Sequence, residues 1–187
     1  GVPVNDRPKS SLIVTQTARQ SLERRLSESA IRNPQSAIAL LHPTAAFATK
    51  QWSTENFART AEFLHEKGLQ TVAVAAKNEA SVLDDLSRKS NVPLLTFDDL
   101  KLPEITALAS KASVFIGNDS GIAHIAAAVG TPSVVIFGSS NRTHWRPWTD
   151  APNEIVFEPL PCQPCPGRVC TEFGDPNCIL DVTPSAV

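Results

Sequence analysis

The sequence predicts an α/β fold, in which helices cover both faces of a Rossmann-like, doubly wound parallel sheet. Two observations lead to this class. Short apolar runs that are typical of buried strands alternate with stretches of helical spacing from residue 37 to residue 158. Polar loops of small residues follow several of these runs, and such loops form ligand sites at the carboxyl ends of parallel strands.

The first part of the chain alternates helix and strand after a polar start. Residues 1–35 are expected to form a linker and a lead-in helix at 17–29, where apolar side chains recur at helical spacing. The apolar run at 37–41 predicts the first strand. A helix with Ser53 or Thr54 as its cap follows, and the run at 71–76 predicts the next strand.

The alternation continues to residue 160. The expected elements, in order, are a helix at 80–90, a strand at 93–97, a helix at 102–110 and strands at 114–116, 133–137 and 154–158. Pro103 suits the first turn of its helix. We therefore expect one Rossmann-like domain over residues 36–160 and a cysteine-rich segment over residues 161–187.

Composition narrows the function classes. The 187 residues are 42% hydrophobic and carry a formal net charge of -2, so no basic excess points to a nucleic-acid partner. No apolar run approaches the ~20 residues that span a membrane, and no signal segment is evident, which favours the cytoplasm. Because the chain lacks Met and begins Gly-Val-Pro, we expect it to be a piece of a longer protein.

The stretch from Ser113 to Pro132, S-V-F-I-G-N-D-S-G-I-A-H-I-A-A-A-V-G-T-P, is the centre of the predicted site. An apolar run leads into a polar turn, Ser120 is a good helix cap, and a small-residue helix follows. Backbone N–H groups at such a helix start bind anions, and Gly121 allows phosphates to approach closely. Asp119 and His124 flank this turn.

Two other loops offer polar groups at strand ends. Thr44 and Thr49 supply hydroxyls, and Lys50 supplies a point charge for phosphate, although a single loop lysine is more often only solvated. Glu79 follows the next strand. It either complements the start of a helix or accepts hydrogen bonds from ribose hydroxyls.

Four cysteines gather near the end of the chain, with the spacing C-x2-C-x4-C-x7-C. They are Cys162, Cys165, Cys170 and Cys178. A structural zinc site, two disulfides or free thiols that pack a loop are all compatible with this spacing. We expect no catalytic role for them. The absence of cysteine elsewhere favours a reducing compartment.

Two motifs carry a family resemblance. The motif D-S-G-x-x-H-x-A-A-A-x-G-T-P at Asp119–Pro132 resembles the C-terminal domain of the lipopolysaccharide heptosyltransferases, glycosyltransferase family 9 of GT-B fold, and most of all heptosyltransferase II. The motif H-P-x-A-x-x-x-x-K-x-W at His42–Trp52 is similar to the family's second motif, although Thr44 stands where the family has glycine. Cysteine-rich stretches resembling this one occur in heptosyltransferase II relatives.

The resemblance implies an inverting transferase that binds ADP-heptose here and a lipopolysaccharide inner-core acceptor through a missing N-terminal domain, which also holds the base. Lys50 and Asp119 are the implied catalytic residues. The implied donor-binding residues are Thr44, Lys50, Glu79, Asp119, Ser120, Gly121 and His124. No metal is implied for catalysis. Peripheral association with the inner membrane is expected, and this piece alone should bind donor weakly and show no turnover.

Two alternatives remain open at this point. The first is a non-catalytic module that binds a nucleotide through the same glycine turn. The second is a GT-B-fold sugar-nucleotide epimerase, which shares the architecture but has motifs less like D-S-G-x-x-H.

Overall fold

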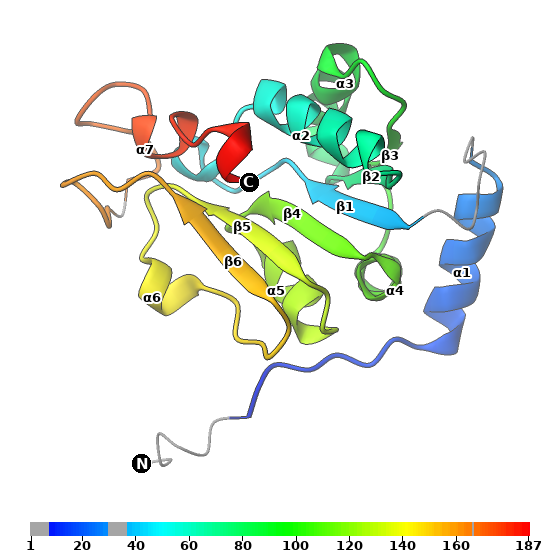
Figure 1. The fold of residues 1–187 in the computed structure, drawn as a ribbon. Helices are drawn as coiled ribbons and strands as arrows, with labels where there is room; N and C mark the ends of the chain where they lie inside the picture. The colour runs from blue at the N-terminus through cyan, green and yellow to red at the C-terminus, as the bar shows by residue number, and fades with distance from the viewer. Residues whose placement is uncertain (1–7, 30–36, 166) are drawn as a thin grey trace.

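The computed structural model describes residues 8–29, 37–165 and 167–187. Residues 1–7 of the predicted linker and the predicted domain boundary at residue 35 lie outside the described residues. The strands are β1 Ile38–His42, β2 Gln70–Val74, β3 Leu95–Phe97, β4 Val114–Asn118, β5 Ser133–Phe137 and β6 Asn153–Phe157. They form one six-stranded parallel sheet in the order β3-β2-β1-β4-β5-β6, which confirms the predicted class (Figure 1).

Helices cover both faces of this sheet. The α-helices are α1 Gln16–Ser27, α2 Thr54–Glu66, α3 Ala80–Lys89, α4 Leu102–Lys111, α5 Gly121–Ala128, α6 Arg142–Trp145 and α7 Asn177–Leu180. Three short 3-10 helices, η2 Ala48–Lys50, η3 Lys77–Glu79 and η4 Pro184–Ala186, lie in connections and near the end of the chain. Within the described residues, no helix is long and apolar enough to pass through a bilayer.

The strand order reverses between β1 and β4. Leu40 of β1 pairs with Val72 of β2 on one side and with Phe115 of β4 on the other. From β1 the chain builds outward through β2 to β3, then returns to the opposite side of β1. The carboxyl ends of all strands lie at one edge of the sheet, on the left in Figure 1. The crevice at such a reversal is where open α/β sheets bind ligands.

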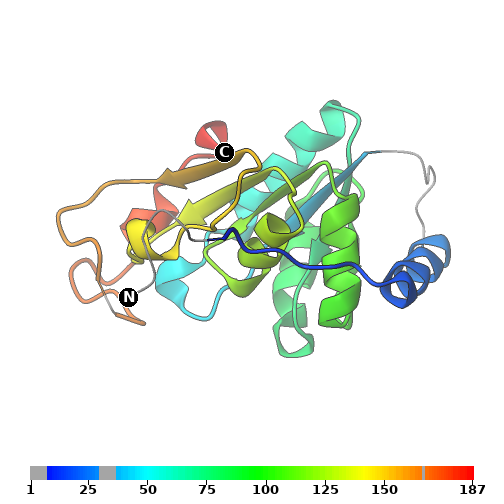
Figure 2. The same cartoon turned by 90° about the horizontal axis from the view of Figure 1, so that it is seen from below.

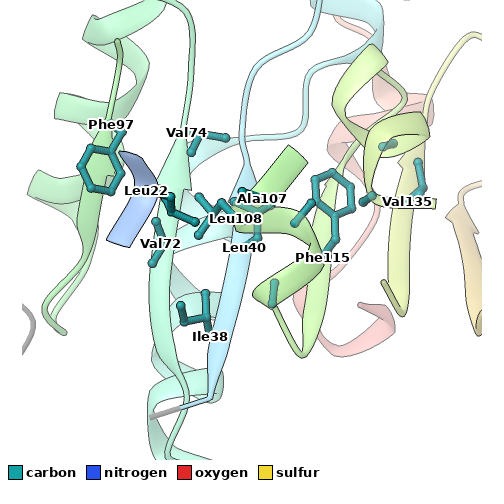
Figure 3. Packing of buried hydrophobic residues seen from close by; sticks show 14 of the residues in the cluster. Leu22, Ile38, Leu40, Val72, Val74, Phe97, Ala107, Leu108, Phe115 and Val135 are labelled. Atoms are coloured by element: carbon teal, nitrogen blue, oxygen red, sulfur yellow. The ribbon is translucent and has the colours of Figure 1, made fainter. Parts of the chain in front are cut away.

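Successive side chains of each strand point into different cores, because side chains alternate along a strand. On one face, Leu40, Val72 and Phe115 pack under α1, α4 and α5 (Figure 3). Figure 2 shows this face from below, with the extended segment before α1 crossing α5 and α4. Leu41 and Ile116 face the other core, under α2 and α3.

The boundaries differ from prediction by one or two residues at most ends. Of the two expected caps of α2, Ser53 is the one that serves, accepting a hydrogen bond from the Asn56 N–H at 3.2 Å. The lead-in helix α1 is capped by Thr15 and packs into the first core through Leu22. Helices α6 and α7 are not predicted from the sequence, because helices of four residues are too short to show a period.

Candidate functional site

The candidate site lies at the carboxyl ends of β1 and β4. One wall is the loop that leaves β1 at His42 and passes through η2 to Trp52. The other is the turn that leaves β4 at Asn118 and enters α5 at Gly121. The Trp52 N–H donates to Oδ1 of Asn118 at 3.0 Å, which fastens the first wall to the end of β4.

Lys50 and Asp119 form an ion pair that joins the two walls. The Nζ atom of Lys50 lies 2.8 Å from Oδ2 of Asp119, and the side chains are 22% and 6% exposed. Trp52 is buried beneath this loop, and its indole N–H donates to the Val182 carbonyl at 2.8 Å. Because Trp52 is fixed on two sides, the loop holds the lysine against the carboxylate.

A chain of hydrogen bonds joins Glu79, Thr44, His42 and Ser120. The Thr44 hydroxyl donates to Oε2 of Glu79 at 3.0 Å and lies 3.2 Å from Nε2 of His42. Since that hydroxyl has one proton, His42 must donate from Nε2, and its Nδ1 accepts from the Ser120 hydroxyl at 3.1 Å. The network therefore selects one tautomer of a neutral imidazole.

His42 is neutral because it is buried. Burial lowers its pKa to about 4, although the Glu79 carboxylate acts in the opposite direction. His42 belongs to the motif at residues 42–52 but is not among the predicted site residues. The available signal was its place as the last residue of a buried strand, where a polar side chain must find partners.

Ser120 occupies the N-cap position of α5 but does not cap it. Its backbone is extended as a cap requires, yet its side chain accepts no hydrogen bond from the helix, because it is turned to His42. Ser120 is therefore the N-cap residue, as predicted, but its side chain does not form the capping hydrogen bond. The first turn of α5 is left open, and a Cβ atom added at Gly121 would meet nothing within 4 Å.

Of the other predicted site residues, Glu79 makes hydrogen bonds within the site and His124 makes none. Oε2 of Glu79 also accepts a hydrogen bond from the Ala76 N–H at 3.1 Å, so the carboxylate stabilises the turn before α3. His124 is half-buried in α5 and makes no side-chain hydrogen bond or ion pair within the described residues. The structure thus pairs Lys50 with Asp119 directly. Thr44, Glu79 and Ser120 are linked in one hydrogen-bond chain that passes through His42. His124 belongs to neither group.

The cysteine-rich segment forms an outer wall beside Lys50. The Thr49 hydroxyl donates to the Gly167 carbonyl at 2.9 Å and accepts from the Ser139 hydroxyl at 3.0 Å. A Cβ atom at Gly138 would lie 2.2 Å from the Thr49 carbonyl oxygen, so only glycine permits this approach. The loops after β1 and β5 and the cysteine-rich segment are therefore packed as one unit.

All four cysteines are free thiols, so the interpretation as two disulfides is wrong. They line a common small cavity with Thr49 and Ser139. In the part of the chain that the structure describes, no three or more His, Cys, Asp or Glu side chains are arranged to hold a metal ion. Burial raises the pKa of the Cys178 thiol, and the three neighbouring cysteines raise it further.

Comparison with known sequences points to one group of proteins. A family model described as glycosyltransferase family 9 (heptosyltransferase) matches residues 6–174. Lipopolysaccharide heptosyltransferase 3 of Escherichia coli is 34% identical over 122 residues, which covers 63% of this chain and 35% of that protein.

Comparison with solved structures supports the fold. E. coli ADP-heptose lipopolysaccharide heptosyltransferase II aligns with a TM-score of 0.76 at 19% identity, covering 97% of this chain and 53% of that one. The dodecameric iron-containing heptosyltransferase TibC, in complex with ADP-D-beta-D-heptose, aligns with a TM-score of 0.64 at 20% identity. That alignment covers 85% of this chain and 45% of TibC.

Proposed function

Because this chain belongs to glycosyltransferase family 9, the heptosyltransferases, we propose that it is the donor-binding part of an ADP-heptose:lipopolysaccharide heptosyltransferase. The matched part of the chain covers about a third of the E. coli relatives, 35% of each. We therefore assign the nucleotide sugar to this chain. The lipopolysaccharide acceptor is assigned to the part of the relatives that this chain does not match.

The observation that carries the proposal is the Lys50–Asp119 pair beside the open first turn of α5. Cleavage of the bond between heptose and ADP leaves negative charge on the departing diphosphate. Positive groups fixed in advance lower the barrier of such a step. Lys50 supplies a point charge and the N–H groups of α5 supply a dipole, while Asp119 holds the ammonium in position.

The other residues fit the nucleoside and sugar ends of the donor. Thr44 and Glu79 lie together beyond β1 and β2, and a carboxylate there can accept hydrogen bonds from ribose hydroxyls. Gly121 gives room for a phosphate at the helix start, next to Ser120. His124 is assigned to the donor side of α5 by its motif alone.

The transfer itself needs a base that takes the proton of the acceptor hydroxyl. We assign this base to the acceptor-binding part and to no residue of the present chain. Inversion at the anomeric carbon follows from direct attack opposite the departing ADP. Since the acceptor is a lipid-linked sugar, we place the reaction at the cytoplasmic face of the inner membrane, with peripheral association of the enzyme.

Calorimetric titration of the protein with ADP, UDP and GDP tests the donor assignment. We expect ADP to bind most tightly, and ADP-heptose to bind at least as well as ADP. Equal affinities for the three nucleotides would contradict the proposal and favour a general nucleotide-binding module. Release of ADP from ADP-heptose, measured with lipopolysaccharide core acceptor, tests transfer. Turnover by residues 1–187 alone would overturn the assignment of the base to another part.

A further inference from the structure

We propose that Arg168, carried by the cysteine-rich segment, is a second cation that binds the diphosphate of the donor. The inference rests on the proposed function and concerns the same site. The motifs that place Lys50 and Asp119 do not include Arg168, and the starting observation is the charge of the site.

The charged side chains around the site carry more negative than positive charge. Asp119 neutralises Lys50 at 2.8 Å, and the Glu79 carboxylate adds a further negative charge. His42 contributes no compensating charge near neutral pH, because its pKa is lowered to about 4. A diphosphate at this site would therefore meet two carboxylates and one ammonium beside the N–H groups of α5, and a further cation would offset the excess of negative charge.

Arg168 is the cation that the fold brings to the same place. Its Cζ atom lies 4.9 Å from the ring centroid of Phe47, and the Nζ atom of Lys50 lies 5.8 Å from that centroid. The two positive groups thus converge on one aromatic ring. Arg168 is exposed, and no carboxylate within the described residues forms a salt bridge with it.

The backbone fixes Arg168 relative to Lys50. The residue before Lys50 is Thr49, and its hydroxyl donates to the carbonyl of Gly167, the residue before Arg168, at 2.9 Å. The Cys165 N–H donates to the Ser139 carbonyl at 2.9 Å, which ties the same segment to the loop after β5. Packing of the cysteine-rich segment therefore sets the position of both cations together.

The chemistry of arginine suits this task. A guanidinium presents paired N–H donors that match two oxygens of a phosphate, and it stacks on aromatic rings while remaining charged. On Phe47 the guanidinium is held over a ring, yet its edge stays available to solvent and to a ligand. Lys50 and Arg168 together then balance the charges of Asp119 and Glu79, so the site loses the net negative charge that its side chains otherwise carry.

The test compares ADP with AMP, because only ADP carries the second phosphate. In Arg168→Gln we expect ADP affinity to fall about tenfold or more, as for loss of a charge-assisted bidentate contact, while AMP affinity changes much less. Arg168→Lys should recover part of the loss. The matched control is Arg146→Gln, which removes the same charge from an exposed residue next to α6 and should leave ADP affinity unchanged.

The outcomes separate this inference from the proposed function. Failure of the unaltered protein to bind ADP would remove the proposed function itself. ADP binding that is equal in the unaltered protein and in Arg168→Gln would overturn the role of Arg168 alone. Equal losses for ADP and AMP, or a lowered melting temperature in Arg168→Gln, would show that Arg168 only holds the loop, and would also overturn the inference.

Discussion

The ammonium of Lys50 lies 2.8 Å from the carboxylate of Asp119, although 69 positions separate the two residues in the sequence. They meet because β1 and β4 are neighbours, with His42 in register with Gly117. The pair is asymmetric, since the Asp119 side chain is 6% exposed and the Lys50 side chain is 22% exposed. Removal of either partner therefore has different consequences for the one that remains.

Lys50→Met should destabilise the protein more than Asp119→Asn. The first change leaves a buried carboxylate without its partner, which costs about 3–5 kcal/mol when an ion pair is fully buried. The second leaves an ammonium that can still turn to water. Urea unfolding of both single variants and of the double variant measures the coupling, and the double variant should regain part of the loss.

The same variants test the site by ADP binding. Both single changes should weaken ADP binding, Lys50→Met by loss of charge and Asp119→Asn by loss of the group that positions Lys50. Arg59→Gln, an exposed residue of α2 paired with Glu55 on the protein surface, is the control. Unchanged ADP affinity in both Lys50→Met and Asp119→Asn would remove the site assignment.

The sequence was sufficient to predict the alternation of helices and strands, because apolar runs at 37–41, 71–76 and 133–137 coincide with buried strands of the sheet. The spacing of apolar residues along the sequence does not predict the order of the strands in the sheet. That order depends on which strands pair, as β1 does with both β2 and β4. Lys50 and Asp119 were each predicted as site residues from their motifs, but their contact follows only from the pairing of β1 with β4.

Other parts of the site escaped prediction for physical reasons. Ser120 has the residue type and position of a helix cap, yet a hydrogen-bond partner from another strand, His42, takes its hydroxyl. Arg168 lies in an irregular segment, whose path depends on distant contacts such as that between Thr49 and Gly167. Local sequence rules cannot supply partners that come from 78 or 118 positions away.

Two glycine substitutions should distinguish a glycine needed for ligand binding from a glycine needed for packing of the fold. Gly121→Ala should leave stability unchanged or raise it by about 0.4–1 kcal/mol, because the added methyl group meets nothing within 4 Å and restricts the unfolded chain. ADP affinity should nevertheless fall, since the methyl group occupies the approach of a phosphate to the start of α5.

Gly138→Ala is the counterpart. Its Cβ atom would lie 2.2 Å from the Thr49 carbonyl oxygen and 3.0 Å from Cβ of Ile179, so the backbone must move. The free energy of unfolding should therefore fall by about 1–3 kcal/mol. Thermal melting and ADP titration of both variants check the two expectations. An undiminished ADP affinity in Gly121→Ala would show that no phosphate approaches this turn.

Cys178 should be the least reactive of the four thiols. The thiolate is the reactive form, and burial together with the neighbouring cysteines raises the pKa of Cys178. Alkylation at pH 8 followed by peptide mass spectrometry should modify Cys178 last in the folded protein, and all four cysteines at similar rates in urea. If all four cysteines resist alkylation until a chelator is added, and the protein contains zinc, the result would instead support the structural zinc site.

His42 should make the stability of the protein depend on pH between about 6.5 and 4. Its pKa is lowered to about 4 in the folded protein, against an ordinary value near 6.5 in the unfolded chain. Below pH 6.5 the unfolded chain binds a proton that the folded protein does not bind. Stability from this group is therefore complete above pH 6.5 and decreases as the pH falls towards 4, by about 3 kcal/mol in all.

Urea unfolding from pH 7.5 to pH 4 measures this effect. His42→Gln should lose the part of the pH dependence that belongs to the imidazole, whereas His65→Gln, at an exposed position of α2, should retain it. Should His42→Gln fail to fold, the imidazole proton signals of the unaltered protein give the same information. We expect the His42 signals to stay constant from pH 8 to pH 5, because Ser120 and Thr44 hold the neutral ring in one tautomer. A titration of these signals near pH 6.5 would contradict the buried hydrogen-bond chain on which this prediction depends.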